Sequence, residues 1–134
     1  MIMLSRLHVS SLLICLSLAA CVQPPPAPPA PGLLDVAERP AEKALLAGIR
    51  AYDDAQYPVA ETQLGNAINA GLASAKDKAA AHKHLAFIYC TSNRVRECES
   101  AFRSALQADP AFMLNKSEQG HPLWGPVYQR VTKP

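Results

Sequence analysis

Residues 79–110 decide the fold, and they read AAAHKHLAFIYCTSNRVRECESAFRSALQADP. The stretch is rich in residues that favour helix, and no part of it alternates with the period of two that marks a strand. Pro110 ends the second helical segment, because proline disfavours helix at the residue before it. The same composition runs from Asp35 onward. We therefore predict a domain of the all-α class.

An internal repeat lies within this helical region. Ala47-Gly48, Tyr52, Ala60, Leu64 and Ala67 recur 38 residues later as Leu85-Ala86, Cys90, Cys98, Phe102 and Ala105. These positions fit the tetratricopeptide pattern, in which small residues let two helices approach closely and large ones fill the space between them. The pattern predicts two tetratricopeptide-like helix hairpins. The alternative is a generic helical bundle whose spacing is a coincidence.

The second helix of the first hairpin has signals at both ends. Tyr57-Pro58 stands at its expected start, where proline is tolerated, and Asn69-Ala70-Gly71 at its expected end. The spacing between the hairpins is four residues longer than the usual unit of about 34 residues. We expect these extra residues in a longer loop near Ser74 to Lys78.

A third segment is expected beside the second hairpin, because two such repeats are usually too few to be stable alone. If the repeats span residues 35–112, residues 113–134 remain as a C-terminal cap. Trp124 is the only tryptophan of the chain, and Val127, Tyr128 and Val131 have the spacing of one face of a short helix. We expect Trp124, Val127 and Tyr128 to fold back onto the second hairpin.

The first residues have the character of an export signal. Arg6 supplies a basic start, and Val9 to Ala20 is an apolar run shorter than the roughly 20 residues of a membrane span. Leu18-Ala19-Ala20-Cys21 resembles the bacterial lipobox, whose cysteine thiol receives a diacylglycerol before the leader is removed. We therefore expect residues 1–20 to be a lipoprotein signal peptide and Cys21 to carry a covalent lipid. The alternative is an ordinary signal peptide followed by a chance cysteine.

The residues after Cys21 predict a location and a tether. Val22 stands where an aspartate would favour the inner membrane, so by resemblance to enterobacterial sorting we expect a lipid anchor in the outer membrane, with the domain on the periplasmic face. Proline is dense in residues 23–31, which forbids helix and favours a polyproline II segment of roughly 25–30 Å. Residues 21–34 are therefore expected to be the lipidated cysteine and a semi-rigid tether. The alternative is a proline-rich ligand for a partner.

The helical region also resembles a known family. The residues that carry the resemblance are His82-Lys83-His84-Leu85-Ala86-Phe87-Ile88-Tyr89-Cys90, Arg96, Cys98, Phe102, Ala105-Leu106, Asp109-Pro110-Ala111-Phe112 and Glu118-Gln119-Gly120-His121-Pro122-Leu123-Trp124-Gly125-Pro126-Val127. They look like the TssQ family of lipoproteins associated with the type VI secretion system, over about Leu45 to Val131. The resemblance implies a scaffold or accessory factor whose protein partners are envelope components of that system. The alternative is a lipoprotein of general cell-envelope maintenance or assembly.

Cys90 and Cys98 form a pair of candidates for a disulfide. Each stands four residues from Arg94, near the expected hairpin turn, which places them on facing antiparallel helices. A bridge forms when their Cβ atoms come within about 4.5 Å, and disulfides persist in oxidising compartments such as the periplasm. The alternative is two small buried residues, since Cys98 occupies a position that usually holds alanine.

Other chemistry has little support in the sequence. The net charge is +2, with Lys and Arg scattered rather than clustered, so we expect no nucleic-acid partner. His82 and His84 point to nearly opposite sides of a helix, so we expect no metal. Asp53-Asp54 is interpreted as a solvated helix end. No catalytic motif stands out, and we expect no enzyme activity, small-molecule substrate or cofactor apart from the lipid.

Protein binding remains, and the tetratricopeptide resemblance indicates where it occurs. In such domains the first helix of each hairpin usually lines the ligand-binding face. By that resemblance the lining residues here are Leu45, Ile49 and Tyr52, with Glu42 and Asp53, from the first unit, and Lys83 and Phe87, with Thr91, from the second. An apolar centre with a few charges suits a peptide or a helix. Alternatively, the chain's own C-terminal tail fills this face.

Overall fold

The computed structural model describes Ala27, Pro29, Gly32, Asp35 and residues 38–133. All the helices discussed below belong to one compact unit, Pro31–Pro134. The predicted signal peptide, Cys21 and nearly all of the tether lie outside the described residues. In the part of the chain that is described, no helix is long and apolar enough to cross a membrane.

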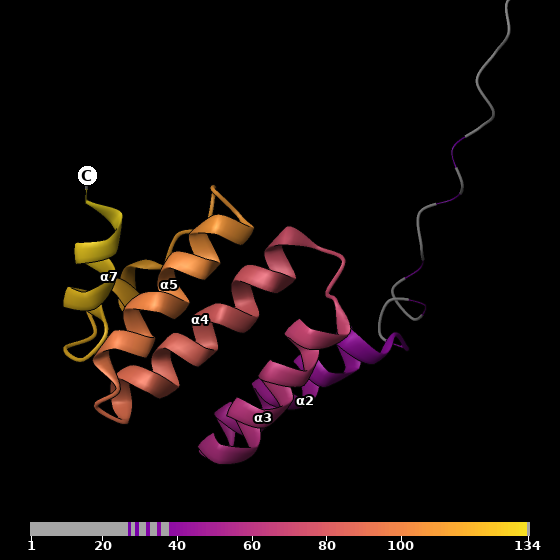
Figure 1. Cartoon of the computed structure of the whole chain (residues 1–134), viewed down its shortest axis with the longest axis horizontal. Helices are drawn as coiled ribbons and strands as arrows, with labels where there is room; N and C mark the ends of the chain where they lie inside the picture. Colours follow the sequence, from indigo (N-terminus) through magenta and orange to yellow (C-terminus); the bar gives the residue numbers. More distant parts are fainter. Residues whose placement is uncertain (1–26, 28, 30–31, 33–34, 36–37, 134) are drawn as a thin grey trace, which may run out of the picture. The chain divides into compact units, whose positions relative to one another are not determined.

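The first hairpin consists of α2 (Pro40–Asp53) and α3 (Tyr57–Ala70), which pack along each other (Figure 1). A proline stands in the first turn of each helix, and Gly71 ends α3 in the left-handed conformation at a φ of 86°. At their closest approach, a Cβ atom on Gly48 would lie 2.8 Å from Cγ of Leu64. The small residue predicted at this position therefore allows the two helices to touch.

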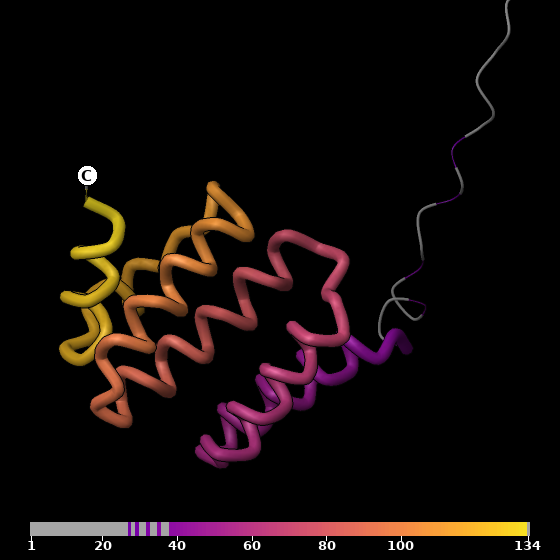
Figure 2. Tube along the Cα trace, viewed as in Figure 1, coloured from indigo at the N-terminus to yellow at the C-terminus, as the bar shows by residue number. Residues whose placement is uncertain are grey.

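The second hairpin consists of α4 (Ala75–Thr91) and α5 (Val95–Ala108), and α4 packs on α3. Ala86 and Ala105 are fully buried between the helices, and so is Phe102. The predicted alternation of small and large residues is therefore confirmed. Figure 2 shows the path of the chain through the two hairpins.

The predicted loop near Ser74 to Lys78 is wrong. α4 begins at Ala75 and has 17 residues, three more than α2, so the extra spacing is helix rather than loop. The hydroxyl of Ser74 accepts a hydrogen bond from the backbone N–H of Asp77, which caps the helix. An acidic residue in the first turn and the alanines after it favour helix there as well.

The tail forms the cap with α6 (Lys116–Gln119) and α7 (Gly125–Thr132). α7 packs on α5, and the ring of Tyr128 lies 5.3 Å from that of Phe102. A Cβ atom on Gly125 would collide with the carbonyl oxygen of Gln119, so the turn between α6 and α7 requires glycine. The described chain thus forms an all-α fold of two tetratricopeptide-like hairpins and a C-terminal capping segment.

Candidate functional site

The two first helices of the hairpins lie side by side and form one surface. We call the surface of Leu45, Ile49 and Tyr52 on α2 together with Lys83 and Phe87 on α4 the inner face. The structure brings its two halves together, because the ring of Tyr52 lies 6.3 Å from that of Phe87. The ring of His84 lies between the two halves, with its centroid 5.2 Å from that of Tyr52 and 6.2 Å from that of Phe87.

The α4 half of the inner face is covered by the C-terminal tail. The ammonium group of Lys83 lies 2.7 Å from the carboxylate of Glu118, and the indole of Trp124 stacks on Phe87 with ring centroids 4.2 Å apart. The Trp124 N–H donates to the carbonyl oxygen of Glu118 at 2.9 Å. Phe87 keeps only 3% of its surface exposed and Trp124 only 8%. The tail therefore occupies on α4 the surface that a partner would need.

The α2 half of the inner face is partly open. Leu45 is buried in the core, but Ile49 and Tyr52 are half-buried and Asp53 is exposed. The ring of Tyr57, which begins α3, lies 5.7 Å from Tyr52 and is 38% exposed. The accessible part of the predicted binding surface therefore lies at the end of α2, next to the turn of the first hairpin.

Two other predicted lining residues are used inside the protein. Glu42 is buried, and its carboxylate accepts a hydrogen bond of 3.4 Å from the backbone N–H of Ala73. Thr91 is exposed, but its hydroxyl lies 2.9 Å from the carbonyl oxygens of Phe87 and Ile88 in its own helix. Neither side chain is set up to receive a partner.

The electrostatic setting of the face follows from burial. Burial lowers the pKa of His84, against the opposing effect of the hydrogen bond that its Nδ1 donates to the carbonyl oxygen of Ala80 at 2.7 Å. Burial also raises the pKa of Tyr52, and the nearby Tyr57, Asp53 and Glu118 raise it further.

A disulfide joins Cys90 at the end of α4 to Cys98 in the first turns of α5, with Cα atoms 5.2 Å apart. Between them Arg94 lies over the ring of Tyr89, 4.2 Å from its centroid, and pairs with the carboxylate of Glu61 on α3. The bridge closes the turn of the second hairpin, and the ion pair joins that turn to the first hairpin.

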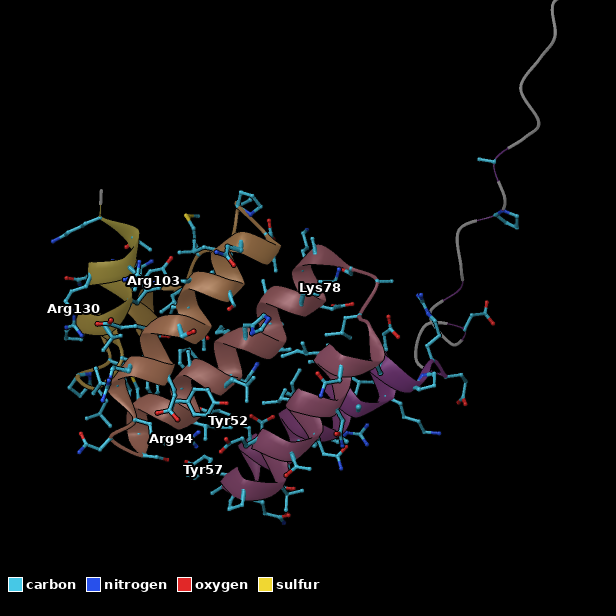
Figure 3. All side chains as sticks on the ribbon, in the orientation of Figure 1. Tyr52, Tyr57, Lys78, Arg94, Arg103 and Arg130 are labelled. Carbon is cyan, nitrogen blue, oxygen red and sulfur yellow. A yellow bond between two sulfur atoms is a disulfide. The ribbon has the colours of Figure 1, made fainter. Side chains whose placement is uncertain are left out.

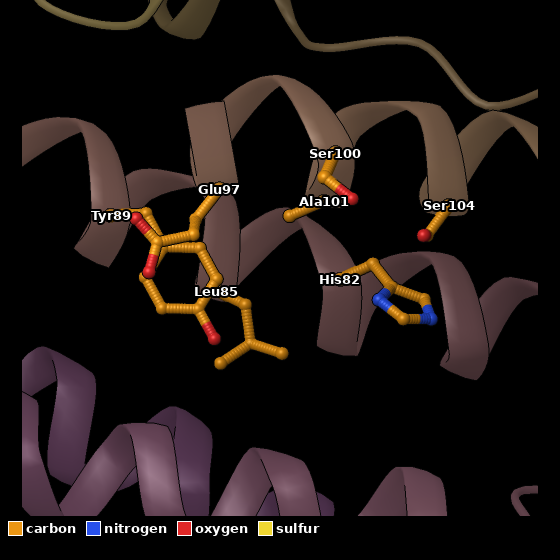
Figure 4. A pocket seen from close by; sticks show the side chains of 7 residues that line it. All are labelled: His82, Leu85, Tyr89, Glu97, Ser100, Ala101 and Ser104. Carbon is orange, nitrogen blue, oxygen red and sulfur yellow. The ribbon is translucent and has the colours of Figure 1, made fainter. Parts of the chain in front are cut away.

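A shallow cleft on another side of α4 gathers polar residues (Figure 4). Its lining consists of His82, Leu85, Tyr89, Glu97, Ser100, Ala101 and Ser104. Serine, histidine and glutamate are the residue types of a hydrolytic triad, but no hydrogen bond joins His82 to Glu97 or to either serine in this described cleft. A triad needs a base in hydrogen-bond reach of its nucleophile, so the cleft lacks that arrangement.

Sequence reasoning did not identify three residues that shape the inner face. These are Tyr57, His84 and Glu118. Tyr57 and Glu118 lie outside the predicted lining helices, whereas His84 lies on one of them, three residues before Phe87. Two signals were available: that helical spacing of His84 from Phe87, and a tyrosine five residues after Tyr52, across an expected turn.

Within the described residues, no group of three or more His, Cys, Asp or Glu side chains could hold a metal ion. Comparisons with protein families, curated proteins and solved structures find no match for this chain.

Proposed function

We propose that this protein is a lipid-anchored adaptor that binds a protein segment on its inner face and assists the type VI secretion system. The observation that carries the binding role is the open α2 half of that face. There Ile49 and Tyr52 remain accessible while the tail covers the α4 half. Tetratricopeptide hairpins provide rigid surfaces of this kind for peptides and helices.

The secretion setting rests on the resemblance to the TssQ family. Its distinctive features are the cysteine pair and the Gly-His-Pro-Leu-Trp-Gly-Pro-Val tail, residues 120–127. Both features have a structural role in this chain, because the cysteines form a disulfide within the second hairpin and Trp124 covers Phe87 on α4. The residues that carry the resemblance are thus also residues that hold this fold together.

Co-purification from membranes tests the adaptor role. Full-length tagged protein, cross-linked in a bacterium that produces it, should retain envelope components of the secretion system, identified by mass spectrometry. Ile49→Glu should reduce this capture, since it places a charge on the inner face. Ala47→Glu is the matched control, because Ala47 is exposed on the same helix and, two residues from Ile49, points to nearly the opposite side. Capture of general cell-wall proteins alone, unaffected by Ile49→Glu, would favour envelope maintenance instead.

The anchor is tested by a single substitution. Cys21→Ser removes the thiol that the lipid would require, so we expect the protein to move from the membrane fraction to the soluble periplasmic fraction. Three acyl chains exceed the two signals that suffice for stable anchoring, so the shift should be nearly complete. Wild-type protein should incorporate labelled palmitate and the variant should not. Unchanged fractionation, with no label on the wild type, would rule out the lipoprotein assignment.

A further inference from the structure

The tail shows what the α4 half of the inner face recognises. α4 offers a cation and an aromatic ring, Lys83 and Phe87, and the tail supplies an anion and an aromatic ring, Glu118 and Trp124. The ammonium group also lies 5.6 Å from the Phe87 centroid, so charge and ring form one unit. Occupation of this half therefore depends on an apolar contact coupled to charge complementarity.

The open α2 half has the same composition with the opposite charge. Its aromatic rings are Tyr52 and Tyr57, and its charge is the carboxylate of Asp53, with Asp54 beside it. Both aspartates are exposed at the C-terminal end of α2, where the helix dipole already makes the potential negative. Anions are unfavourable at this position, so the local sequence is not optimised for helix stability here.

The cations described in this region offset its charge only in part. Arg94 is shared between Glu61 and Glu97, which leaves a carboxylate in excess, and Lys83 is paired with Glu118. Arg50, in the last turn of α2, forms no ion pair with either aspartate among the described residues. Figure 3 labels the side chains of Tyr52, Tyr57 and Arg94.

We propose that Tyr52, Tyr57 and Asp53 bind a basic segment of the partner protein, in which a lysine or arginine stands next to an apolar or aromatic residue. The cation lies over the exposed Tyr57 ring and beside the Asp53 carboxylate, and the apolar residue packs on Tyr52 and Ile49. This inference rests on the proposed adaptor function and specifies the chemistry of its partner. A basic segment complements the charge of Asp53, in the same way that Glu118 of the tail complements Lys83 on α4.

The probe is a fluorescein-labelled octapeptide with two arginines flanking a phenylalanine in a glycine and serine background. Fluorescence anisotropy with the full chain in neutral detergent micelles should show binding that weakens as salt is added. Asp53→Asn should weaken it about threefold, in the range of an exposed ion pair, and Tyr57→Leu by about the same factor, in the range of an exposed cation–π contact. The double variant should lose about tenfold. A peptide with glutamates in place of the arginines should not bind.

Asp109→Asn is the charge-matched control. Asp109 caps the far end of α5, about 20 Å along that helix from Arg94, and asparagine keeps the oxygen that accepts from the Ala111 N–H. Binding should be unchanged in this variant. Asp53→Asn should bind less while its thermal midpoint stays equal or rises, because it removes an anion from a helix C-terminus.

Three results of the peptide measurements would overturn the inference. The first is equal weakening by Asp53→Asn and Asp109→Asn, which means attraction to net charge alone. The second is absence of binding, or equal binding of the glutamate peptide. The third is a large change in the fluorescence of Trp124 on binding, which places the peptide on α4 in exchange for the tail. If the Asp53→Asn/Tyr57→Leu variant still captures the partner from membranes, the adaptor function stands and this inference fails.

Discussion

Replacement of Trp124 by alanine should lower the free energy of unfolding by about 3–5 kcal/mol, the range for truncation of a buried aromatic side chain. The indole stacks on Phe87 and on the ring of His121, and its N–H donates to the Glu118 carbonyl oxygen. The variant loses all these contacts and uncovers Phe87 on α4. Domains typically have only about 5–15 kcal/mol of stability. Urea unfolding followed by circular dichroism measures the change.

The neighbouring residue gives a matched control. Leu123 is 51% exposed, so Leu123→Ala should change the unfolding free energy by less than about 0.5 kcal/mol. Trp124→Phe should fall between the two, because it retains a stacked ring but loses the N–H donor. An unchanged thermal midpoint for Trp124→Ala, together with loss of the captured partner, would contradict the capping role and make the tail itself the binding site.

Removal of the Cys90–Cys98 disulfide should lower the unfolding free energy by about 2.5 kcal/mol, the value that the chain-entropy model gives for so short a loop. The bridge spans eight residues and closes the turn between α4 and α5. The double variant Cys90→Ala/Cys98→Ala is compared with the oxidised protein. Both proteins also carry Cys15→Ser and Cys21→Ser, which removes the other two cysteines of the chain. Urea unfolding with and without reductant measures the difference.

The reductant should lower the stability of the oxidised protein and leave the double alanine variant unchanged. Thiol titration of the denatured, oxidised protein in this background should find no free thiol. Two free thiols in material taken directly from the periplasm, or a midpoint that reductant does not move, would contradict the assignment. Reduction should also loosen the ion pair of Arg94 with Glu61, because the bridge fixes the turn that carries Arg94.

The pattern of small and large residues was enough to predict the two hairpins. Helices can approach closely only where side chains are small, and the 3.6-residue period repeats those positions along each helix. Gly48 and Ala86 stand at corresponding positions of the two units, and both are buried at helix contacts. The lone tryptophan likewise predicted the cap, because the edge of the second hairpin needed a large apolar cover.

The error at residues 74–78 came from the repeat length rather than from local signals. A serine followed three residues later by an acidic residue is typical of a helix start, and Ser74 and Asp77 form that cap. The prediction gave more weight to the usual repeat length than to this cap, and it therefore placed the extra residues in a loop. In the structure α4 is simply longer at its N-terminal end.

The sequence by itself determined the helix hairpins, the facing cysteines and the cap, because each depends on the periodicity of one helix or the spacing across one turn. Only the tertiary structure decided which half of the inner face stays open. Lys83 and Glu118 are 35 residues apart, and Phe87 and Trp124 meet only because the chain after α5 lies back over α4. Contacts over such separations have no periodic pattern in the sequence, since they depend on where two rigid segments end in space. Likewise, only the folded hairpins pair Arg94 with Glu61 and Lys83 with Glu118, which engages these two cations away from Asp53.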